Sequence, residues 1–388
     1  MNYKTIMAML LPAFLLLQLP LQSADFPLVF RQDFEKKYSK TFDVNGSGNV
    51  RLENRYGSIV VETWERDEVR IDVRIKVSAD DQEDADKTFD RIEINMSGGG
   101  NSASATTSIG NSRRSSKGIF ERIFDGDWSW GGNSSNDFKV YYSVKMPASA
   151  SLETEAKYCD VTLPDLSGDN RITVGYGDLV GGDLTGANEI SISYGSARLD
   201  ELGTDSRFRI RYSDGVIRMA GDLKYDGRYS ETRIGRAGNL DIDAGYEELE
   251  IDAAKVVRLD GNYNEVDLDR AERVFLDGNY SDFNLGTVEL ELEVDASYGD
   301  LEIDNLKAGF ERVYIRANYI DVEIDIESGS GYEMDLRARY GDISYDRSNA
   351  TNVNSSKEGS SESVTGTVTG RGKGRVDIST SYGDIELY

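Results

Sequence analysis

Tyrosine recurs along this chain at a nearly constant interval. From Tyr158 onward the spacing is 17 or 18 residues for eight steps, followed by steps of 21, 21 and 42 residues. The twelve tyrosines that share this interval are Tyr158, Tyr176, Tyr194, Tyr212, Tyr229, Tyr246, Tyr263, Tyr280, Tyr298, Tyr319, Tyr340 and Tyr382. A fixed period near 20 residues is typical of a solenoid, in which each repeat is one structural rung and only stacking buries a core.

Each interval has the same internal pattern. Apolar residues alternate with polar ones before the tyrosine, as in Ile190 and Ile192 before Tyr194, which predicts a half-buried strand. A small residue and an acid then follow, and this pair predicts a corner before a second short strand. The tyrosine shares the phase of the inward residues, so we expect its ring to line the interior or its corner. On this basis Tyr263 is a core residue, and Tyr225, which is off the interval, contributes far less to stability.

The predicted fold is therefore all-β: a single-chain parallel β-solenoid with rungs of 17–21 residues and one short helix near the N-terminus. A β-sandwich would also give many short strands, but it would not keep one side chain at one phase for a dozen rungs. The chain has five prolines, and the last is Pro164. Interior strands exclude proline because it removes a ladder hydrogen-bond donor, so this distribution agrees with the solenoid.

The sequence divides into three parts. Residues 1–24 combine a basic start, an apolar run and small residues, which predicts a cleaved signal peptide and an exported protein. The run is short for the alternative, a membrane anchor. Residues 25–150 are predicted to form a β region with a short helix at 80–90 and a flexible Gly/Ser insertion at 97–118. Residues 151–388 are the solenoid, with a second flexible insertion at about 347–370.

Charge and composition exclude several classes of function. The net charge of −26 opposes nucleic-acid binding, which needs clustered Lys and Arg, and also opposes binding to anionic membranes. The absence of histidine excludes a Ser-His-Asp triad, a Cys-His pair and a His-containing zinc site. The one cysteine, Cys159, occupies a small-residue corner position, where we expect a turn residue rather than a nucleophile. No membrane span is expected after signal cleavage, and no cofactor is expected beyond weakly bound calcium or magnesium.

Acidic residues are predicted to form columns when the rungs stack. One column follows each tyrosine by two residues, and another precedes it by three: Asp226, Asp243, Asp260, Asp277 and Asp295. Like charges about 4.8 Å apart repel, so we expect raised carboxyl pKa values and sensitivity to calcium or magnesium. Full solvation of the columns is the alternative.

Two further groups are candidate binding sites. Arg207, Arg209 and Arg211 should point outward on one rung, with Arg228 on the next. They form either a docking patch for an anionic glycan or protein, or charge balance for nearby acids such as Asp226. The segment 120–132 carries Trp128 and Trp130, and it is either a binding loop or a cap over the end of the solenoid.

The motif resembles a known family. The segment VRLENRYGSIVVETWERDEVRIDV at 50–73, the short helix and the repeated YGD rungs resemble the bacterial β-strand-repeat family called putative adhesins, whose function is unknown. These are akin to the head GIN-domain auto-transporter adhesins. The resemblance covers residues 42–388 and carries no catalytic residues. It implies a right-handed β-helix at the cell surface or in the periplasm.

The leading hypothesis for function is a non-enzymatic, exported solenoid that binds a partner or gives structure at the bacterial envelope. The partner would be a glycan or an envelope protein. One alternative is a polysaccharide lyase or glycosidase on the same fold, which would need paired carboxylates in a groove. Another is an accessory protein in envelope-stress signalling.

Overall fold

The computed structural model describes residues 31–110 and 137–388 of the chain. The N-terminal elements are β1 (Gln32–Asp43), β2 (Asn49–Thr63), β3 (Glu68–Ala79), α1 (Gln82–Phe89), β4 (Ile92–Gly98), β5 (Ser102–Ile109) and β6 (Asp137–Met146). The predicted helix is confirmed. The side chain of Asp81 caps it by accepting a hydrogen bond from the Asp84 amide at 2.9 Å.

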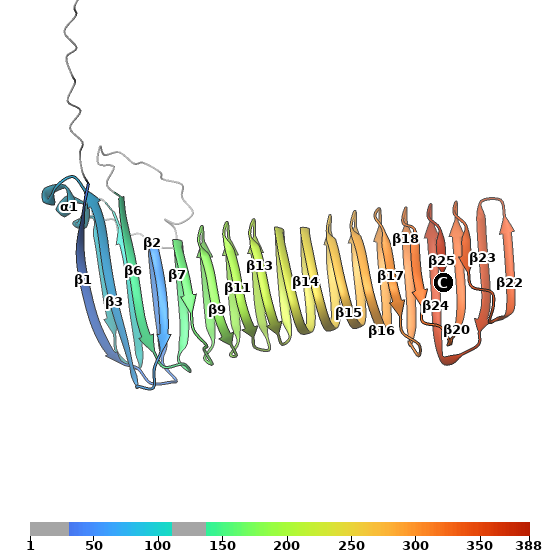
Figure 1. Ribbon diagram of the computed structural model, residues 1–388, viewed down its shortest axis with the longest axis horizontal. Coiled ribbons are helices and arrows are strands. Elements are labelled where there is room, and N and C mark those ends of the chain that lie inside the picture. Colours follow the sequence, from blue (N-terminus) through green and yellow to red (C-terminus); the bar gives the residue numbers. More distant parts are fainter. Residues whose placement is uncertain (1–30, 111–136) are drawn as a thin grey trace, which may run out of the picture.

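A rod of stacked rungs follows (Figure 1). Its strands are β7 (Ser151–Leu163), β8 (Asn170–Gly175), β9 (Asp178–Leu184), β10 (Asn188–Ser193), β11 (Ser196–Leu202), β12 (Ser206–Arg211), β13 (Asp214–Ala220), β14 (Leu223–Asn262), β15 (Glu265–Asn279), β16 (Asp282–Ser297), β17 (Leu301–Leu306), β18 (Arg312–Asn318) and β19 (Val322–Ile326). The C-terminal strands are β20 (Ser330–Arg339), β21 (Ile343–Tyr345), β22 (Ala350–Glu358), β23 (Ser361–Val368), β24 (Arg371–Ser381) and β25 (Ile385–Leu387).

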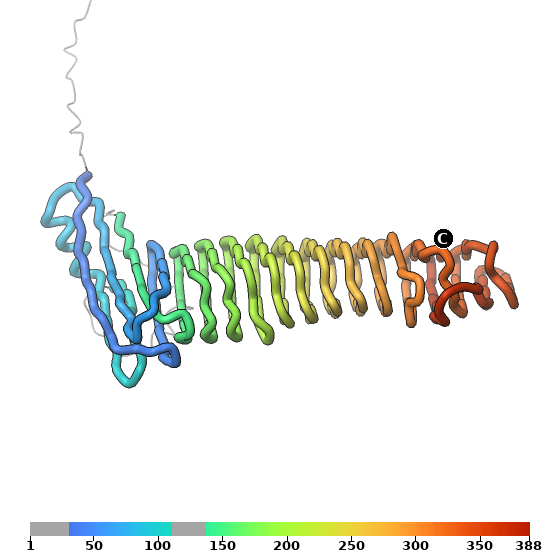
Figure 2. Tube along the Cα trace, turned by 60° about the horizontal axis from the view of Figure 1, so that its bottom comes forward, coloured from blue at the N-terminus to red at the C-terminus, as the bar shows by residue number. Residues whose placement is uncertain are grey.

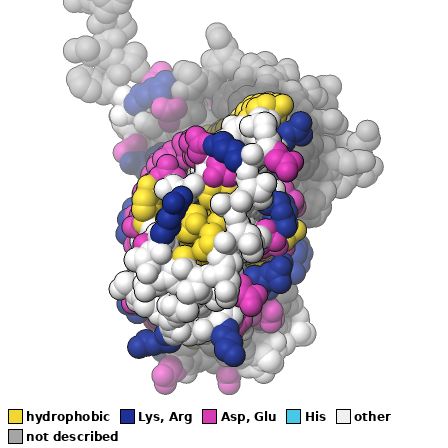
Figure 3. All heavy atoms as spheres, turned by 90° about the vertical axis from the view of Figure 1, so that its right-hand side faces the viewer, with side chains coloured by type: hydrophobic (Ala, Val, Ile, Leu, Met, Phe, Trp, Pro, Cys, Tyr) yellow, Lys and Arg dark blue, Asp and Glu magenta, His cyan; other side chains and the backbone are white. Residues whose placement is uncertain are grey.

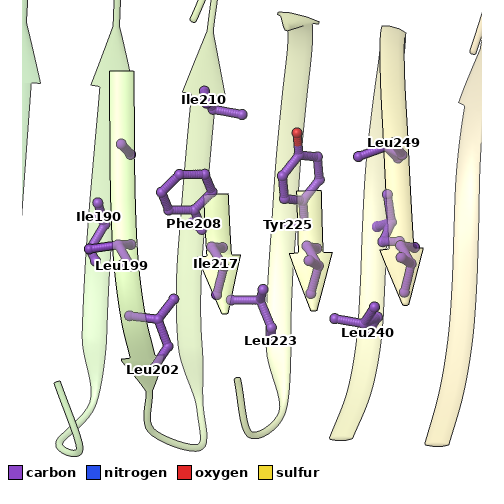
Figure 4. Close-up of a cluster of buried hydrophobic side chains, with 14 of the residues drawn as sticks. Ile190, Leu199, Leu202, Phe208, Ile210, Ile217, Leu223, Tyr225, Leu240 and Leu249 are labelled. Atoms are coloured by element: carbon purple, nitrogen blue, oxygen red, sulfur yellow. The ribbon is translucent and has the colours of Figure 1, made fainter. Parts of the chain in front are cut away.

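Each rung of the rod contributes two strands to two facing layers. The strand before the tyrosine pairs in parallel with the same strand of the next rung, as β8, β10 and β12 do, and β9, β11 and β13 form the second stack. Alternate side chains point between the layers. Figure 4 shows Ile190 and Phe208 from the first stack facing Leu199 and Ile217 from the second. All four are at most 1% exposed, so the core runs along the rod axis.

The two ends depart from this simple repeat. At the N-terminal end, β2 pairs with β7 in parallel. The other N-terminal strands form antiparallel pairs of β1 with β3, β3 with β6 and β4 with β5. The prediction of an all-β chain is therefore confirmed, and the sheet is mixed, with parallel pairs along the rod and antiparallel pairs at its ends. Part of the predicted flexible insertion at 97–118 is in fact the hairpin of β4 and β5, and residues 111–118 lie outside the described residues.

At the C-terminal end the last rung is out of sequence order. Strand β24 pairs in parallel with β18 on one side and β20 on the other, and β25 likewise lies between β19 and β21. The connection into β20 skips one rung height and turns at Gly329, whose φ of +84° favours glycine. The final residues of the chain therefore fill a slot between two earlier rungs (Figures 1 and 2).

The prediction of a flexible insertion at about 347–370 is also wrong. These residues form the antiparallel hairpin of β22 and β23, and β23 pairs with β20 along residues 332–339. The hairpin covers an edge of the sheet that would otherwise present unpaired N–H and C=O groups. The Ser, Thr and Gly content of this segment suggests a flexible loop. The segment nevertheless forms strands, and Val364 of β23 is buried, opposite Leu336 of β20.

Candidate functional site

The tyrosines form one continuous external ladder. Each has a positive φ, between 50° and 62°, including Tyr56 of β2, which the interval did not include. Left-handed backbone is uncommon in residues other than glycine. The left-handed corner turns the ring outward, so that Tyr263 is 47% exposed and Tyr280 is 51% exposed. The expectation that the rings line the interior is therefore wrong, and the corner position is right.

The rings stack on one another along the whole rod. Neighbouring centroids lie 4.6–5.2 Å apart, as from Tyr263 to Tyr280 at 5.0 Å and from Tyr319 to Tyr382 at 4.6 Å. The spacing matches the distance between adjacent strands. The ladder order is Tyr319, Tyr382, Tyr340, which follows the inserted rung. Because each ring covers the face of the next, a ligand meets ring edges and hydroxyl groups rather than open aromatic faces.

An acidic groove runs beside the middle of this ladder. It has a volume of about 660 Å³. Its lining consists of the tyrosines, the acids two residues later and the residue between them in sequence, which we call the floor position. The lining residues are Gly195, Tyr212, Ser213, Asp214, Tyr229, Ser230, Glu231, Tyr246, Glu247, Glu248, Tyr263, Asn264, Glu265, Tyr280 and Asp282. We call this the tyrosine–acid groove.

Three acids in the middle of this groove differ from other corner acids. Asp178 and Asp321, outside the groove, each accept a hydrogen bond from a backbone N–H of the adjacent rung, at 3.0 and 2.8 Å, and so does Asp282 at one end of the groove, at 3.1 Å. Within the part of the chain that the structure describes, the side chains of Glu231, Glu248 and Glu265 form no hydrogen bond and no ion pair, although the Glu231 backbone N–H donates to the Ser213 carbonyl. Repulsion from Glu231, with smaller contributions from burial and Glu265, raises the pKa of Glu248 above its usual value. The predicted repulsion is therefore present at Glu248, whose carboxylate accepts no hydrogen bond from a turn amide.

Glu247 is the buried carboxyl on the floor of the groove. It is 3% exposed, and its Oε2 lies 2.6 Å from the hydroxyl of Tyr225, which is itself 2.8 Å from the Thr232 hydroxyl. Burial raises the pKa of Glu247 to about 7, against the lowering effect of the Tyr225 hydrogen bond. Tyr225 is 2% exposed and packs against Phe208. Tyr225 is therefore a core residue, contrary to the expectation that it contributes far less to stability than Tyr263.

The column before the tyrosine is partly neutralised by arginine. Asp260, Asp277 and Asp295 do lie in register on neighbouring strands. Asp226, however, lies 3.4 Å from Arg211 and 3.6 Å from Arg228, and Asp243 lies 2.6 Å from Arg228. Among residues 31–110 and 137–388, no group of three or more His, Cys, Asp or Glu side chains could hold a metal ion. The column therefore offers no built calcium or magnesium site.

The arginine island is tied into the same charge network. Arg209 pairs with Glu189 at 2.9 Å, and Arg211 and Arg228 pair with the aspartates described above. These contacts favour charge balance over a free anion-binding patch. Arg207 is different, because it forms no ion pair among the described residues and lines a separate groove of mixed charge, about 1000 Å³ in volume, together with Lys224 and Arg171. Trp128 and Trp130 lie outside the described residues, so their predicted role stays a prediction.

Cys159 has the properties of a structural residue. It is buried at a corner and accepts a hydrogen bond from the Asn54 amide at 3.4 Å. Burial raises the pKa of its thiol to about 12, so little thiolate exists at neutral pH. The cysteine therefore lacks the activation that a nucleophile needs.

The floor of the groove is the feature that sequence reasoning missed. At the residue after the tyrosine, five consecutive rungs carry polar side chains, whereas the flanking rungs carry Gly177 and Gly195 on one side and Gly299 on the other. The five are Ser213, Ser230, Glu247, Asn264 and Ser281. All but Ser230 are at most 6% exposed. Aligning the intervals on the tyrosine would have revealed this break in the repeat.

The architecture defines an all-β repeat protein with mixed strand pairing and an external tyrosine ladder. A family model described as Toastrack DUF4097 matches residues 44–388, and the chain belongs to this family. The predicted resemblance to an adhesin-like repeat family of unknown function is thereby confirmed. A search of curated proteins finds no match.

Three solved bacterial structures are distantly similar. A "putative cell adhesion protein" from Clostridium sporogenes is 8% identical, with a TM-score of 0.19, covering 91% of this chain and 99% of that one. A "putative adhesin" from Parabacteroides distasonis is 10% identical, with a TM-score of 0.29 and coverage of 75% and 97%. A "putative lipid binding protein" from the same organism is 10% identical, with a TM-score of 0.22 and coverage of 91% and 96%. Because the identities and TM-scores are this low, function must be inferred from the residues of this chain.

Proposed function

We propose that the protein is an exported, non-enzymatic scaffold of the bacterial envelope, which binds a glycan or protein partner along its rod. The observation that carries this proposal is the unbroken external ladder, from Tyr56 to Tyr340, on a rod with a continuous core. A ladder of this kind gives a partner the same chemical groups at each rung. Seen from its C-terminal end, the rod also carries Lys, Arg, Asp and Glu side chains around its rim (Figure 3).

The arrangement of acids supports binding rather than catalysis. A glycosidase or lyase needs an acid and a base that both reach the substrate. Glu247 has a pKa suited to proton transfer, but its carboxyl is buried beneath the corner and hydrogen-bonded to Tyr225. Its neighbours Glu231, Glu248 and Glu265 are exposed and repeat at equal intervals, so no pair is set apart as acid and base.

Export and location remain part of the proposal. The predicted signal peptide at 1–24 lies outside the described residues. In the described part of the chain, no helix has both the length and the apolar character to span a bilayer. Fractionation of cells that produce the full chain would test the location: we expect a processed protein in the envelope or the medium, and an unprocessed protein in the cytoplasm would contradict it.

A binding assay separates the scaffold from the enzyme. The protein purified from residue 25 onward would be incubated with isolated envelope polysaccharide and, separately, with envelope proteins. Retention on one of these without new reducing ends or unsaturated products is the expected result. Product formation that stops in Glu247→Gln would instead support a lyase or glycosidase. Binding only to a membrane signalling protein would favour the envelope-stress role.

A further inference from the structure

We propose that the C-terminal end of the rod is a dimer interface, where a second copy of this chain docks end to end. This goes beyond the proposed scaffold function, because it assigns a partner to one end of the rod. Three features carry it: a step between the two layers, apolar side chains exposed in that step, and the fit of the step to a second copy of itself.

The two layers of the rod end at different heights. The first layer continues from β18 through β24 and β20 to β23 and β22. The second continues from β19 through β25, and among the described residues it ends at β21. Strands β20 and β21 belong to one rung, joined at Tyr340, so the first layer overhangs the second by the two strands of the β22–β23 hairpin. We call this feature the C-terminal step.

Both layers end in an unpaired strand edge at this step. The Asp342 carbonyl and the Asp346 N–H bond to β25, at 3.0 and 3.1 Å. Backbone groups alternate between the two edges of a strand, so those of Ile343 and Tyr345 point away from β25. Within the described part of the chain, β22 pairs with β23 alone. Unpaired edges of this kind are templates for pairing with another chain.

The step exposes apolar side chains that a rod with equal layers would bury. Val353 of β22 is 38% exposed, and Tyr345, Ala350 and Val368 are only partly buried against the core. Seen from this end, hydrophobic side chains lie in the middle and charged ones lie around them (Figure 3). An apolar centre with a polar rim is the usual arrangement of a protein–protein interface.

The C-terminal step fits a second copy of itself. A half turn about an axis that runs between the layers, parallel to the strands, exchanges the two layers and reverses the rod. The overhanging hairpin of each copy then fills the two strand positions that the other copy lacks, with β22 of one copy beside β21 of the other. Both copies use the same surface, as in the isologous interface of a two-fold dimer.

The inner face of the hairpin follows from its register with β20. Gly366 and Glu362 of β23 lie opposite the buried Met334 and Ala338 of β20, and residues directly opposite each other in a strand pair share one face of the sheet. On β22, Lys357 lies opposite Glu362. These positions therefore face the second copy in the proposed dimer.

The inner positions match each other under this rotation. A half turn about an axis parallel to the strands keeps the height of every residue along the strands, so neighbours within one hairpin face each other between two copies. Val353 lies beside Gly366, where an added Cβ would be 3.2 Å from its Cγ2, so each Val353 faces Gly366 of the second copy. Lys357 lies 2.9 Å from Glu362, so each Lys357 faces Glu362 of the second copy. A large side chain thus meets a small one, and a cation meets an anion.

Sedimentation velocity of the protein from residue 25 onward, between about 1 μM and about 100 μM and at about 0.15 M salt, tests the proposal. We expect a monomer–dimer equilibrium. Small-angle X-ray scattering should give the dimer a maximum dimension about twice that of the monomer, because the two rods meet end to end.

One substitution in the step has a matched control elsewhere on the rod. Val353→Asp should weaken the dimer at least about tenfold, because it places a carboxylate inside the closed interface. Val216→Asp adds the same charge at a valine that is 37% exposed, on β13 in the middle of the rod, and should leave the dimer unchanged.

A charge exchange tests which side chains face each other. Lys357→Glu places two carboxylates opposite each other in a homodimer, and Glu362→Lys places two ammonium groups there, so each variant alone should be mainly monomeric. A mixture of the two variants restores opposite charges across the interface and should form a heterodimer. The pair within each chain stays mismatched in the mixture, so recovery reports contact between copies.

Four results would overturn the proposal. A monomer throughout the concentration range would show that the step does not recruit a second copy, even if it binds a strand of another protein. Equal weakening by Val353→Asp and Val216→Asp would indicate a response to overall charge. A dimer about as long as the monomer would be side by side. Absence of the heterodimer, in variants whose circular dichroism shows intact folding, would contradict the facing of Lys357 and Glu362.

Discussion

The middle of the rod and its two ends are built from the same rungs in different ways. In the middle, from β8 to β17, each rung pairs with the rungs that precede and follow it in the sequence. At the ends, rungs pair with strands that are distant in the sequence, as β2 does with β7 and β24 with β18. An interior rung is thus stabilised by the rungs next to it in the sequence. Each end of the rod is instead completed by a strand that is distant in the sequence.

This difference has consequences for stability. In repeat proteins, each rung is stabilised mainly by the interfaces with its neighbours, so damage to one rung spreads only as far as those interfaces allow. A rung that is inserted late in the sequence is shared by two others. Loss of this inserted rung should therefore destabilise the C-terminal end. The loss in stability should be greater than that caused by removing one side chain from the middle of the rod.

The largest expected effect is at the C-terminal slot. Truncation after residue 369 removes Val376, Ile378, Ile385 and Leu387, which are at most 1% exposed. Burial of four such side chains contributes roughly 6–12 kcal/mol. We expect residues 330–368 to lose hydrogen-exchange protection, while residues 170–300 keep theirs. Uniform loss of protection along the rod would show that the ends and the middle form a single cooperative unit.

In the middle, the largest effect should come from Tyr225 and not from the ladder. Tyr225→Ala leaves a cavity beside Phe208 and an unpaired Glu247, and should cost about 3–5 kcal/mol. Tyr263→Ala removes two ring contacts from an exposed ladder, which should cost about 1–3 kcal/mol. Urea unfolding of both variants measures the difference. A greater cost for Tyr263→Ala would restore the interior position that the sequence suggested.

A smaller effect is expected from pH, again in the middle. The folded-state pKa of Glu247, about 7, is above its usual unfolded value near 4.3, so the folded protein binds more protons. Its contribution to stability is fully present below about pH 4 and is lost as the pH rises from there through about 7, by up to roughly 3 kcal/mol. Thermal melts at about pH 5 and pH 8 should show this loss. Glu247→Gln should reduce it, and an unchanged pH profile would assign the effect to other acids.

The smallest effect should come from the arginine island. Arg228→Ala breaks contacts with Asp226 and Asp243 that are partly exposed, and such pairs contribute at most about 1 kcal/mol each. Arg207→Ala breaks no ion pair and should be nearly neutral. The two melting temperatures, measured at low salt, test the charge-balance interpretation. A greater loss in Arg207→Ala would indicate that its groove has a structural role.

Sequence reasoning succeeded where the chain order equals the spatial order. The tyrosine interval gave the rungs, and the alternation of Ile190 and Ile192 gave their inward faces. It failed on the direction of the rings because a period of two fixes the phase along a strand but not the left-handed turn that reverses a side chain. It also missed the groove floor, since a single Glu247 among small residues is visible only when the rungs are aligned.

The 42-residue step before Tyr382 shows the other limit. The sequence predicts a flexible insertion at about 347–370 within this step, but the step contains the hairpin of β22 and β23 and a return to the stack. Periodicity along a chain cannot show that a later rung lies between two earlier ones. That arrangement comes from pairing energies between distant strands, which no local pattern records.

The position of Tyr382 between Tyr319 and Tyr340 also sets a condition on biosynthesis. A chain made from its N-terminus can stack its rungs as they emerge, up to β19. It cannot join β20 to that stack until β24 and β25 have been made, because these two strands lie between them. An incomplete chain would carry bare strand edges, which are targets for proteases and for aggregation. Closure of this tip of the rod thus reports that synthesis has passed β24 and β25.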